Sequence, residues 1–264
     1  MPSTALIWIV LGLCVLAVSV LAYGWFEAGW LRTRVLELPV KGLPAELEGV
    51  RIAHLSDFHF GPLSRGRAAG LRAAEWVRER RPDLVVVTGD LLSRRSGRGD
   101  LDTALAGLDA YAVLGNHDVA VTRDPFSRAA ELDDLPATLL HGTSRLIRLR
   151  RNPVQLAGTE PYANAAIPAT DDAATFRILL SHYPRLRTPG YGLVLSGHMH
   201  AGQIVVPYPR GRIRLAHLRA PLAQGVYRSG RVTLHVSPGL GTTLVPFRFF
   251  ARPEVTELVL RSEP

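Results

Sequence analysis

The stretch Asp83–Asp90 reads DLVVVTGD and combines the two features that decide the fold of this chain. Its first part is a short apolar run rich in valine, which is typical of a β-strand buried on both faces of a sheet. Its last part, Gly89-Asp90, places a carboxylate where that strand ends. The stretch therefore predicts a strand that delivers a polar side chain to the carboxyl edge of a sheet.

The same scheme recurs along the chain. Short β-branched runs alternate with amphipathic helical segments, which favours a layered α/β fold. We expect helices over Arg67–Arg80, Asp100–Leu108 and around Pro125–Leu132. Further strands are expected at Arg51–Ser56, Tyr111–Leu114, Ala137–Leu140, Ser144–Arg150, Val154–Ala157, Phe176–Leu180, Leu193–Leu195, Gln203–Val206, Val232–Val236 and Glu254–Leu260.

Polar clusters follow five of the predicted strands. In chain order they are Asp57-Phe58-His59, Gly89-Asp90, Gly115-Asn116-His117-Asp118, Ser181-His182 and Gly197-His198-Met199-His200. Ligands of open α/β sheets gather outside the carboxyl ends of the strands, so these distant residues are expected to converge on one site. The glycines before Asp90, Asn116 and His198 fit a backbone that turns sharply off a strand end.

The side chains in these clusters are metal-binding types. Carboxylate oxygen, amide oxygen and imidazole nitrogen suit divalent ions such as Mn²⁺, Fe²⁺ or Zn²⁺. The single cysteine, Cys14, lies in an apolar N-terminal run, which excludes an intrachain disulfide and a thiolate-rich zinc site. Two metals about 3.5–4 Å apart can share a carboxylate and a hydroxide and clamp both oxygens of a phosphoryl displacement. With Asp57 and Asp90 as the only anionic ligands, such a centre keeps a positive charge that attracts a phosphoester.

The ordered motifs D-x-H, G-D, G-N-H-D, H and G-H-x-H resemble those of the calcineurin-like metallophosphoesterase superfamily. The resemblance implies a four-layer α/β fold, in which a β-sandwich is flanked by helices, and a dinuclear centre with a bridging hydroxide. It assigns the metal ligands as follows: Asp57, His59 and His200 to one ion, Asn116, His182 and His198 to the other, and Asp90 to both. His117 matches the histidine that protonates the leaving group or stabilises the transition state, and Asp118 matches the carboxylate that orients it.

Other segments resemble the bacterial membrane-associated phosphodiesterase branch of that superfamily. These are Ile52–Asp57, Gly202-Gln203-Ile204, Val236–Gly241 and Pro253–Leu258. One group in that branch cleaves the pyrophosphate of UDP-2,3-diacylglucosamine. The resemblance therefore implies a phosphodiesterase or pyrophosphatase that acts on a lipid-linked or nucleotide-lipid substrate.

The N-terminal run Ala5–Phe26 reads ALIWIVLGLCVLAVSVLAYGWF and carries no charge. Roughly 20 apolar residues are enough to cross a bilayer as a helix. We therefore expect a transmembrane anchor within residues 1–30, a tether or edge strand over 31–48, and the metallophosphoesterase domain over 49–264. A cleaved signal peptide is the alternative, but the run exceeds an h-region of about 7–15 residues and no basic segment precedes it.

Charges that flank the run predict its orientation. Arg32, Arg34, Lys41 and Arg51 follow it, whereas no lysine or arginine precedes it. The positive-inside rule then places the C-terminal domain in the cytoplasm. We expect a single-pass protein of the bacterial inner membrane.

The charge balance leaves two alternatives open. The chain has 31 Lys+Arg against 23 Asp+Glu, a formal net charge of +8, and Lys41 is its one lysine. Arginine suits phosphate contacts, although genome composition also explains so uniform an excess. A nuclease or cyclic-nucleotide phosphodiesterase is thus an alternative, but no basic run interleaved with aromatics marks a nucleic-acid groove. An inactive membrane-anchored binding protein is the alternative of another class, and the complete ligand set argues against it.

Two further features lie outside the motifs. The segment Pro246–Phe250 reads PFRFF, and this composition fits either core packing or contact with lipid headgroups. The remaining histidines are expected in structural or surface positions. They are His54, His141, His217 and His235.

Overall fold

The protein is described by a computed structural model that covers residues 3–61, 65–119, 132, 134–216, 218 and 221–263. Its helices are α1 (Thr4–Ala28), α2 (Gly66–Arg80) and α3 (Arg98–Leu105). The first sheet contains, in order across it, β1 (Arg32–Lys41), β14 (Glu254–Glu263), β2 (Arg51–Leu55), β3 (Leu84–Thr88), β4 (Ala110–Val113) and β5 (Ala137–Leu139). The second contains β12 (Gly225–Ser229), β13 (Val232–Val236), β9 (Leu193–Ser196), β8 (Phe176–Leu180), β7 (Asn152–Gly158) and β6 (Ser144–Leu149). A separate hairpin is formed by β10 (Val205–Tyr208) and β11 (Gly211–Arg214).

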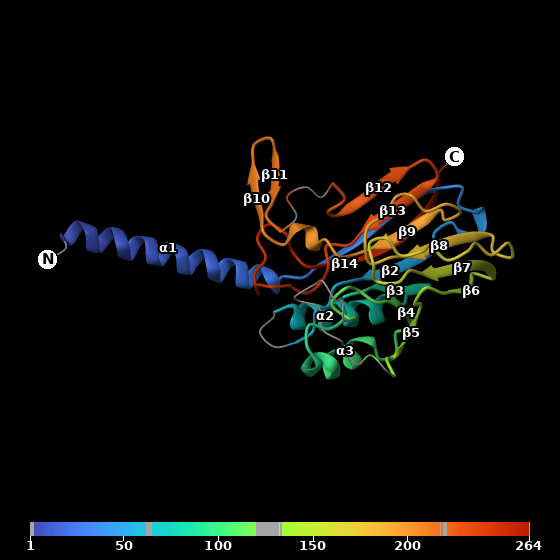
Figure 1. The fold of residues 1–264 in the computed structure, drawn as a ribbon, viewed down its shortest axis with the longest axis horizontal. Coiled ribbons are helices and arrows are strands. Elements are labelled where there is room, and N and C mark those ends of the chain that lie inside the picture. The colour runs from blue at the N-terminus through green and yellow to red at the C-terminus, as the bar shows by residue number, and fades with distance from the viewer. Residues whose placement is uncertain are drawn as a thin grey trace.

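The two sheets pack face to face, and helices α2 and α3 cover the outer face of the first sheet (Figure 1). Alternation along the strands explains this layering. On β3, Leu84 and Val86 belong to the core between the sheets, whereas Val85 and Val87 belong to the core under the helices. The expected class, a β-sandwich flanked by helices with an apolar N-terminal helix, is confirmed. Among the described residues the flanking helices lie on one side only.

Strand direction brings the polar clusters together. Strands β2, β3, β4 and β5 run parallel to one another, and so do β7, β8, β9 and β13. The carboxyl ends of parallel strands meet at one edge of a sheet. The loops after β2, β3 and β4 therefore converge with those after β8 and β9 at one end of the sandwich.

Most of the predicted elements are present. The segment 31–48, expected as a tether or an edge strand, contains β1, which lies at the edge of the first sheet and pairs in parallel along its whole length with β14. Strands β11 and β12 were not predicted from the sequence. The helix expected around Pro125–Leu132 lies outside the described residues, apart from Leu132.

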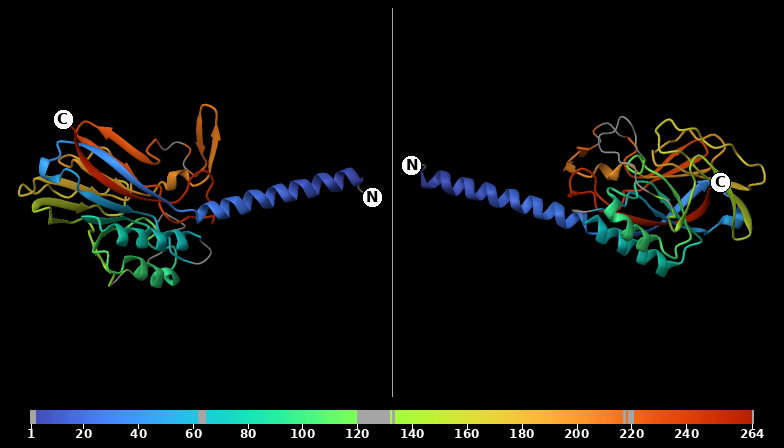
Figure 2. Two further views of the ribbon diagram at one scale, coloured as in Figure 1. Left: turned by 180° about the vertical axis from the view of Figure 1, so that it is seen from behind. Right: turned by 60° about the horizontal axis from the view of Figure 1, so that its bottom comes forward.

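Helix α1 projects away from the domain in every view (Figures 1 and 2). It has 25 residues and suits a membrane span by length and composition. Its domain end is held firmly. The backbone N–H of Arg248 donates to the carbonyl of Gly24 at 3.0 Å, and the amides of Phe250 and Ala251 donate to the buried carboxylate of Glu27 at 2.9 and 2.6 Å.

The segment Pro246–Phe250 shows core packing, one of its two expected environments, and contact with lipid headgroups stays a prediction. Arg248 is fully buried, and the ring of Phe249 packs on Gly24 at a place where any Cβ would overlap it. Phe250, by contrast, is 53% exposed. The segment joins α1 to the interior of the domain.

His54 and His235 form a buried pair between the sheets. Their Nδ1 atoms lie 2.9 Å apart, and Nε2 of His54 lies 2.9 Å from the hydroxyl of Thr88. Burial lowers the pKa of His54 well below its usual value, and burial with the nearby Arg34 charge lowers the pKa of His235 to about 3. Both histidines are structural, as expected, while His141 is exposed and His217 lies outside the described residues.

This pair should make stability depend on pH. The unfolded histidine takes up a proton below about pH 6.5, whereas folded His235 stays neutral down to about pH 3, so the native state loses stability as the pH falls. For His235 the loss between pH 7.5 and 5 amounts to about 2 kcal/mol. We expect His235→Gln to show a smaller drop in unfolding free energy over this range than the wild type. Unfolding with a chelator present measures this, and equal drops would contradict it.

Candidate metal centre

The predicted ligands lie in loops whose backbone turns sharply off the strands. Five have left-handed backbone: Asp57 (φ 52°), His59 (φ 46°), Asp90 (φ 53°), His198 (φ 73°) and His200 (φ 47°). This conformation costs about 1–2 kcal/mol for a residue with a Cβ. Such strain concentrates at functional sites, where the surrounding structure holds it in place.

The glycines beside the ligands have two different roles. Gly89 has a φ of 86° and supplies the turn expected before Asp90. Gly115 and Gly197 instead leave room for neighbouring side chains of the site. A Cβ on Gly115 would overlap the Asp90 carboxylate, and a Cβ on Gly197 would overlap the side chains of Ser56 and Asp57.

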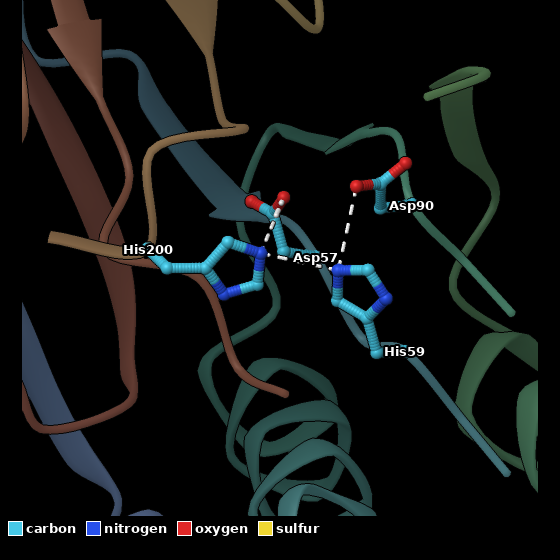
Figure 3. Close-up of side chains that lie close together, drawn as sticks. All are labelled: Asp57, His59, Asp90 and His200. Atoms are coloured by element: carbon cyan, nitrogen blue, oxygen red, sulfur yellow. Dashed lines mark hydrogen bonds and ion pairs between the residues drawn. The ribbon is translucent and has the colours of Figure 1, made fainter. Parts of the chain in front are cut away.

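One group of ligands comprises Asp57, His59, Asp90 and His200, all of them buried (Figure 3). The Nε2 atoms of His59 and His200 lie 3.1 Å apart. Nε2 of His59 is also 3.3 Å from Oδ2 of Asp90, and Nε2 of His200 is 3.5 Å from Oδ1 of Asp57. Figure 3 shows these four side chains pointing toward one another, with Asp57 and His59 from the loop after β2, Asp90 from the loop after β3 and His200 from the segment after β9.

A second group comprises Asp90, His182 and His198. Nε2 of His182 lies 3.3 Å from Oδ2 of Asp90 and 3.2 Å from Nδ1 of His198. Asn116 belongs here too, because its Oδ1 lies 3.1 Å from Nε2 of His182. Asp90 is common to both groups through one oxygen, Oδ2.

Outer contacts fix the imidazole rings, and the sequence did not predict them. Nδ1 of His59 lies 3.1 Å from the Ser93 hydroxyl, and Nδ1 of His182 lies 2.8 Å from the Thr88 carbonyl oxygen. Nη2 of Arg248 lies 3.3 Å from Nδ1 of His200. Partners of this kind orient metal-binding histidines. The one available signal was a single arginine within the aromatic PFRFF segment.

The pKa values of the site residues are shifted because Asp57 and Asp90 are buried away from water. Burial raises the pKa of Asp57. Burial alone would also raise that of Asp90, but the His182 charge and hydrogen bonds from His182 and His59 bring its pKa well below the usual range. Burial opposes protonation of His182, yet Asp90 raises its pKa to about 9. Burial, with the charges of His59 and Arg248, lowers the pKa of His200 well below normal and keeps that ring neutral.

His117 and Asp118 lie at the edge of the two groups. The His117 ring is 4.9 Å, centroid to centroid, from the ring of His59, and its backbone N–H donates to Oδ1 of Asp90 at 2.9 Å. The buried Asp118 carboxylate accepts backbone hydrogen bonds from Gly115 at 2.8 Å and from Leu91 at 2.8 Å. Asp118 thus ties together the loops that carry Asp90 and His117, and these bonds position His117 through the backbone.

The donor set fits divalent cations. Within each of the two groups, one ligand atom per residue lies within 4.8 Å of the others. All the donors are oxygen or nitrogen, and the free cysteine, Cys14, lies on the exposed face of α1. Neutral imidazoles and ionised carboxylates are the forms that bind such ions. The seven predicted ligands are thus brought together around Asp90.

Sequence comparison agrees with this geometry. The family model described as calcineurin-like phosphoesterase matches residues 50–202, which include every residue of both groups. The chain belongs to the calcineurin-like phosphoesterase family. The expected family is therefore confirmed, and a divalent metal site is what this family and the Asp/His groups together indicate.

Several calcineurin-like relatives match most of the chain. A "transmembrane protein with metallophosphoesterase domain" from Danio rerio is 34% identical over 253 residues, covering 86% of this chain but 56% of the relative. The chain thus spans little more than half of that protein. "Phosphodiesterase YaeI" from Escherichia coli (strain K12) is 28% identical over 229 residues, which cover 80% of this chain and 82% of the relative.

Replacing Asp90 should disrupt both groups at once. We expect Asp90→Asn to weaken binding of Mn²⁺ or Zn²⁺ by roughly 100-fold or more, since even outer partners of metal ligands change affinity by roughly 10–100-fold. Metal should also raise the unfolding temperature of the wild type but not of the variant. Elemental analysis after dialysis measures the first effect and thermal unfolding the second.

Asp172→Asn is the matched control, because it removes the same charge from a fully exposed side chain. This variant should bind metal like the wild type. Equal metal content in the two variants would show that Asp90 is not a shared ligand.

Proposed function

We propose that this protein hydrolyses a phosphodiester or pyrophosphate bond in a membrane-linked substrate with the help of two divalent cations. The observation that carries the proposal is the shared Oδ2 of Asp90, which lies 3.3 Å from His59 on one side and 3.3 Å from His182 on the other. A carboxylate between two groups of ligands suits a pair of ions rather than one.

The ligands divide between two positions. One ion would be held by Asp57, His59 and His200, the other by Asn116, His182 and His198, and Asp90 would contact both. When bound, such ions polarise the phosphoryl oxygens and make water acidic enough to act as a nucleophile. The protein's part is to fix these seven side chains in place, and the buried outer contacts of His59, His182 and His200 do so.

His117 is the group proposed to handle the proton of the leaving oxygen. Its ring stands against His59, while its backbone is bonded to Asp90, so it lies beside the reacting phosphate without being needed as a ligand. Asp118 would hold His117 there through the loop contacts described above. General acid catalysis of this kind contributes roughly 10²–10⁴-fold to a rate.

An apolar cavity beside the centre supports a substrate with an apolar or aromatic group near the phosphate. The cavity has a volume of about 290 Å³ and is lined by His198, Met199, Tyr183, Pro184 and Leu222, among others. The ring of Tyr183 lies 4.2 Å from that of His198, which joins the cavity to the second group of ligands. A nucleotide-lipid or phospholipid would place its phosphate at the ligands and an apolar part in this cavity.

The membrane helix supports the same substrate class. Its firm attachment through Gly24 and Glu27 keeps the domain next to the bilayer, where a lipid-linked phosphoester is concentrated. The named phosphodiesterase among the relatives favours a diester. We further propose a single-pass protein of the bacterial inner membrane with this domain in the cytoplasm, because the flanking arginines follow the helix.

Replacing His117 should separate catalysis from metal binding. We expect His117→Gln to lower kcat by roughly 10²–10⁴-fold while metal content stays unchanged, because the residue acts on the leaving group. Activity on bis(p-nitrophenyl) phosphate with Mn²⁺, together with elemental analysis, measures both. His141→Gln, which changes an exposed histidine, is the control.

The substrate class is tested by comparing bis-aryl phosphate, UDP-diacylglucosamine, phospholipids, cyclic nucleotides and DNA in one assay with Mn²⁺. Faster turnover of lipid-bearing phosphoesters is the expected result. Preference for DNA or cyclic nucleotides would overturn the substrate proposal. A lack of hydrolysis of every phosphoester tested would favour an inactive binding protein.

A further inference from the structure

A second cavity lies at the base of the membrane helix, and its lining does not include the metal-binding groups. It has a volume of about 380 Å³, within the range of small-ligand sites. Its walls come from the end of α1, from β1, from the hairpin β10–β11 and from the segment just before β14. The lining residues that carry the argument are Tyr23, Phe250, Arg32, Arg34, Arg212 and Arg252.

The charge in this cavity is strongly one-sided. In the part of the chain that the structure describes, Arg32 pairs with Glu254 at 2.5 Å, but no carboxylate lies within salt-bridge distance of Arg34, Arg212 or Arg252. The one acidic lining residue, Glu27, already accepts hydrogen bonds from two backbone amides. Among the described residues, Arg34 and Arg212 therefore have no ion-pair partner, while the charge of Arg252 is stabilised in part by the more distant Glu27 and Glu254.

These arginines are positioned before any ligand binds. Arg32 and Arg34 are two residues apart on β1, so their side chains leave the same face of the strand. Arg252 stacks 3.8 Å above the ring of Trp30 and donates to the carbonyl oxygens of Trp30 and Leu31, each at 3.1 Å. Burial and the neighbouring charge of Arg32 lower the pKa of Arg252, as expected for like charges held together.

With α1 across a bilayer, the cavity would lie at the depth of the lipid headgroups. Tyr23 lines it and belongs to the last two turns of α1, so Tyr23 to Ala28 rises about 8 Å. That span matches the headgroup layer, which is about 5–8 Å thick on each side of the hydrocarbon core. The rings of Tyr23 and Phe250 lie 6.1 Å apart and are 39% and 53% exposed, which suits the boundary between acyl chains and headgroups.

We propose that this cavity binds the phosphate headgroup of an anionic phospholipid from the adjacent leaflet. Guanidinium groups recognise phosphate through paired hydrogen bonds, and the aromatic residues cover the glycerol and the start of the acyl chains. The site orients the domain on the membrane surface and does not depend on what the metal centre cleaves. A soluble phosphoester offers the same phosphate but lacks the apolar part that Tyr23 and Phe250 address.

The test uses the full chain in an uncharged detergent. Native mass spectrometry follows binding of phosphatidylglycerol, phosphatidylcholine and glycerol 3-phosphate. We expect saturable binding of phosphatidylglycerol that is tighter than that of either other ligand. Arg34→Gln combined with Arg212→Gln should weaken it roughly thirtyfold, because each arginine near an anionic lipid contributes a roughly fivefold factor.

Matched variants separate charge from folding. Arg34→Lys with Arg212→Lys keeps the charge and should retain most of the binding. Arg145→Gln with Arg148→Gln removes two exposed arginines from β6 and should bind like the wild type. Should the double glutamine variant misfold, Arg212→Gln alone changes one exposed hairpin side chain and should weaken binding roughly fivefold.

Three results would overturn the proposal. They are unchanged phosphatidylglycerol binding in a folded Arg34/Arg212 variant, equally tight binding of phosphatidylcholine, and displacement of the lipid by glycerol 3-phosphate at equal concentration. The last result would assign the site to a soluble phosphoester. Because the readout is lipid binding, none of these outcomes depends on the activity of the metal centre.

Discussion

Burial of two aspartates at one end of the sandwich is the constraint on which the rest of the structure depends. Asp57 and Asp90 are withdrawn from water at the carboxyl ends of neighbouring parallel strands. Ionised carboxylates in such a place are costly unless positive charge compensates them. In the protein alone this compensation comes from imidazoles, chiefly His182 beside Asp90. Divalent cations would supply it more fully, which explains why a fold would keep so expensive an arrangement.

The backbone is shaped around these two carboxylates. Left-handed residues aim the ligands inward, and Gly115 and Gly197 leave the space that the carboxylates occupy. Arg248 supports the site from behind His200, on the side of that ring away from His59. It is fully buried, it donates to the carbonyl oxygens of Pro238 and Ala251 at 3.0 and 2.8 Å, and its charge faces His200. The same short segment, residues 247–251, also holds the end of α1, so one segment contacts both the apolar helix and His200.

The sequence predicts those parts of the site that residue type and strand position determine. Apolar runs such as that of β3 identified most of the strands, and the polar residues after them identified the seven side chains that the structure brings together around Asp90. It did not predict Arg248, because the role of that side chain depends on its contact with His200, a residue remote in sequence. It left 31–48 open between a tether and an edge strand and missed β11 and β12, since exposed strands lack the regular apolar alternation of half-buried ones. The space-filling role of Gly115 and Gly197 depends on contacts across loops, which no local pattern records.

The arginine excess illustrates the same limit. In the sequence it is uniform and fits genome composition as well as any function. In three dimensions the arginines separate into distinct environments. Arg80 forms a bidentate pair with buried Glu257 at 2.6 and 3.1 Å, which neutralises a charge inside the first sheet. Arg34 and Arg212, from segments far apart in the chain, instead both line the cavity at the base of α1, and among the described residues no carboxylate lies within salt-bridge distance of either. Positive charge in that place would suit contact with an anionic membrane surface.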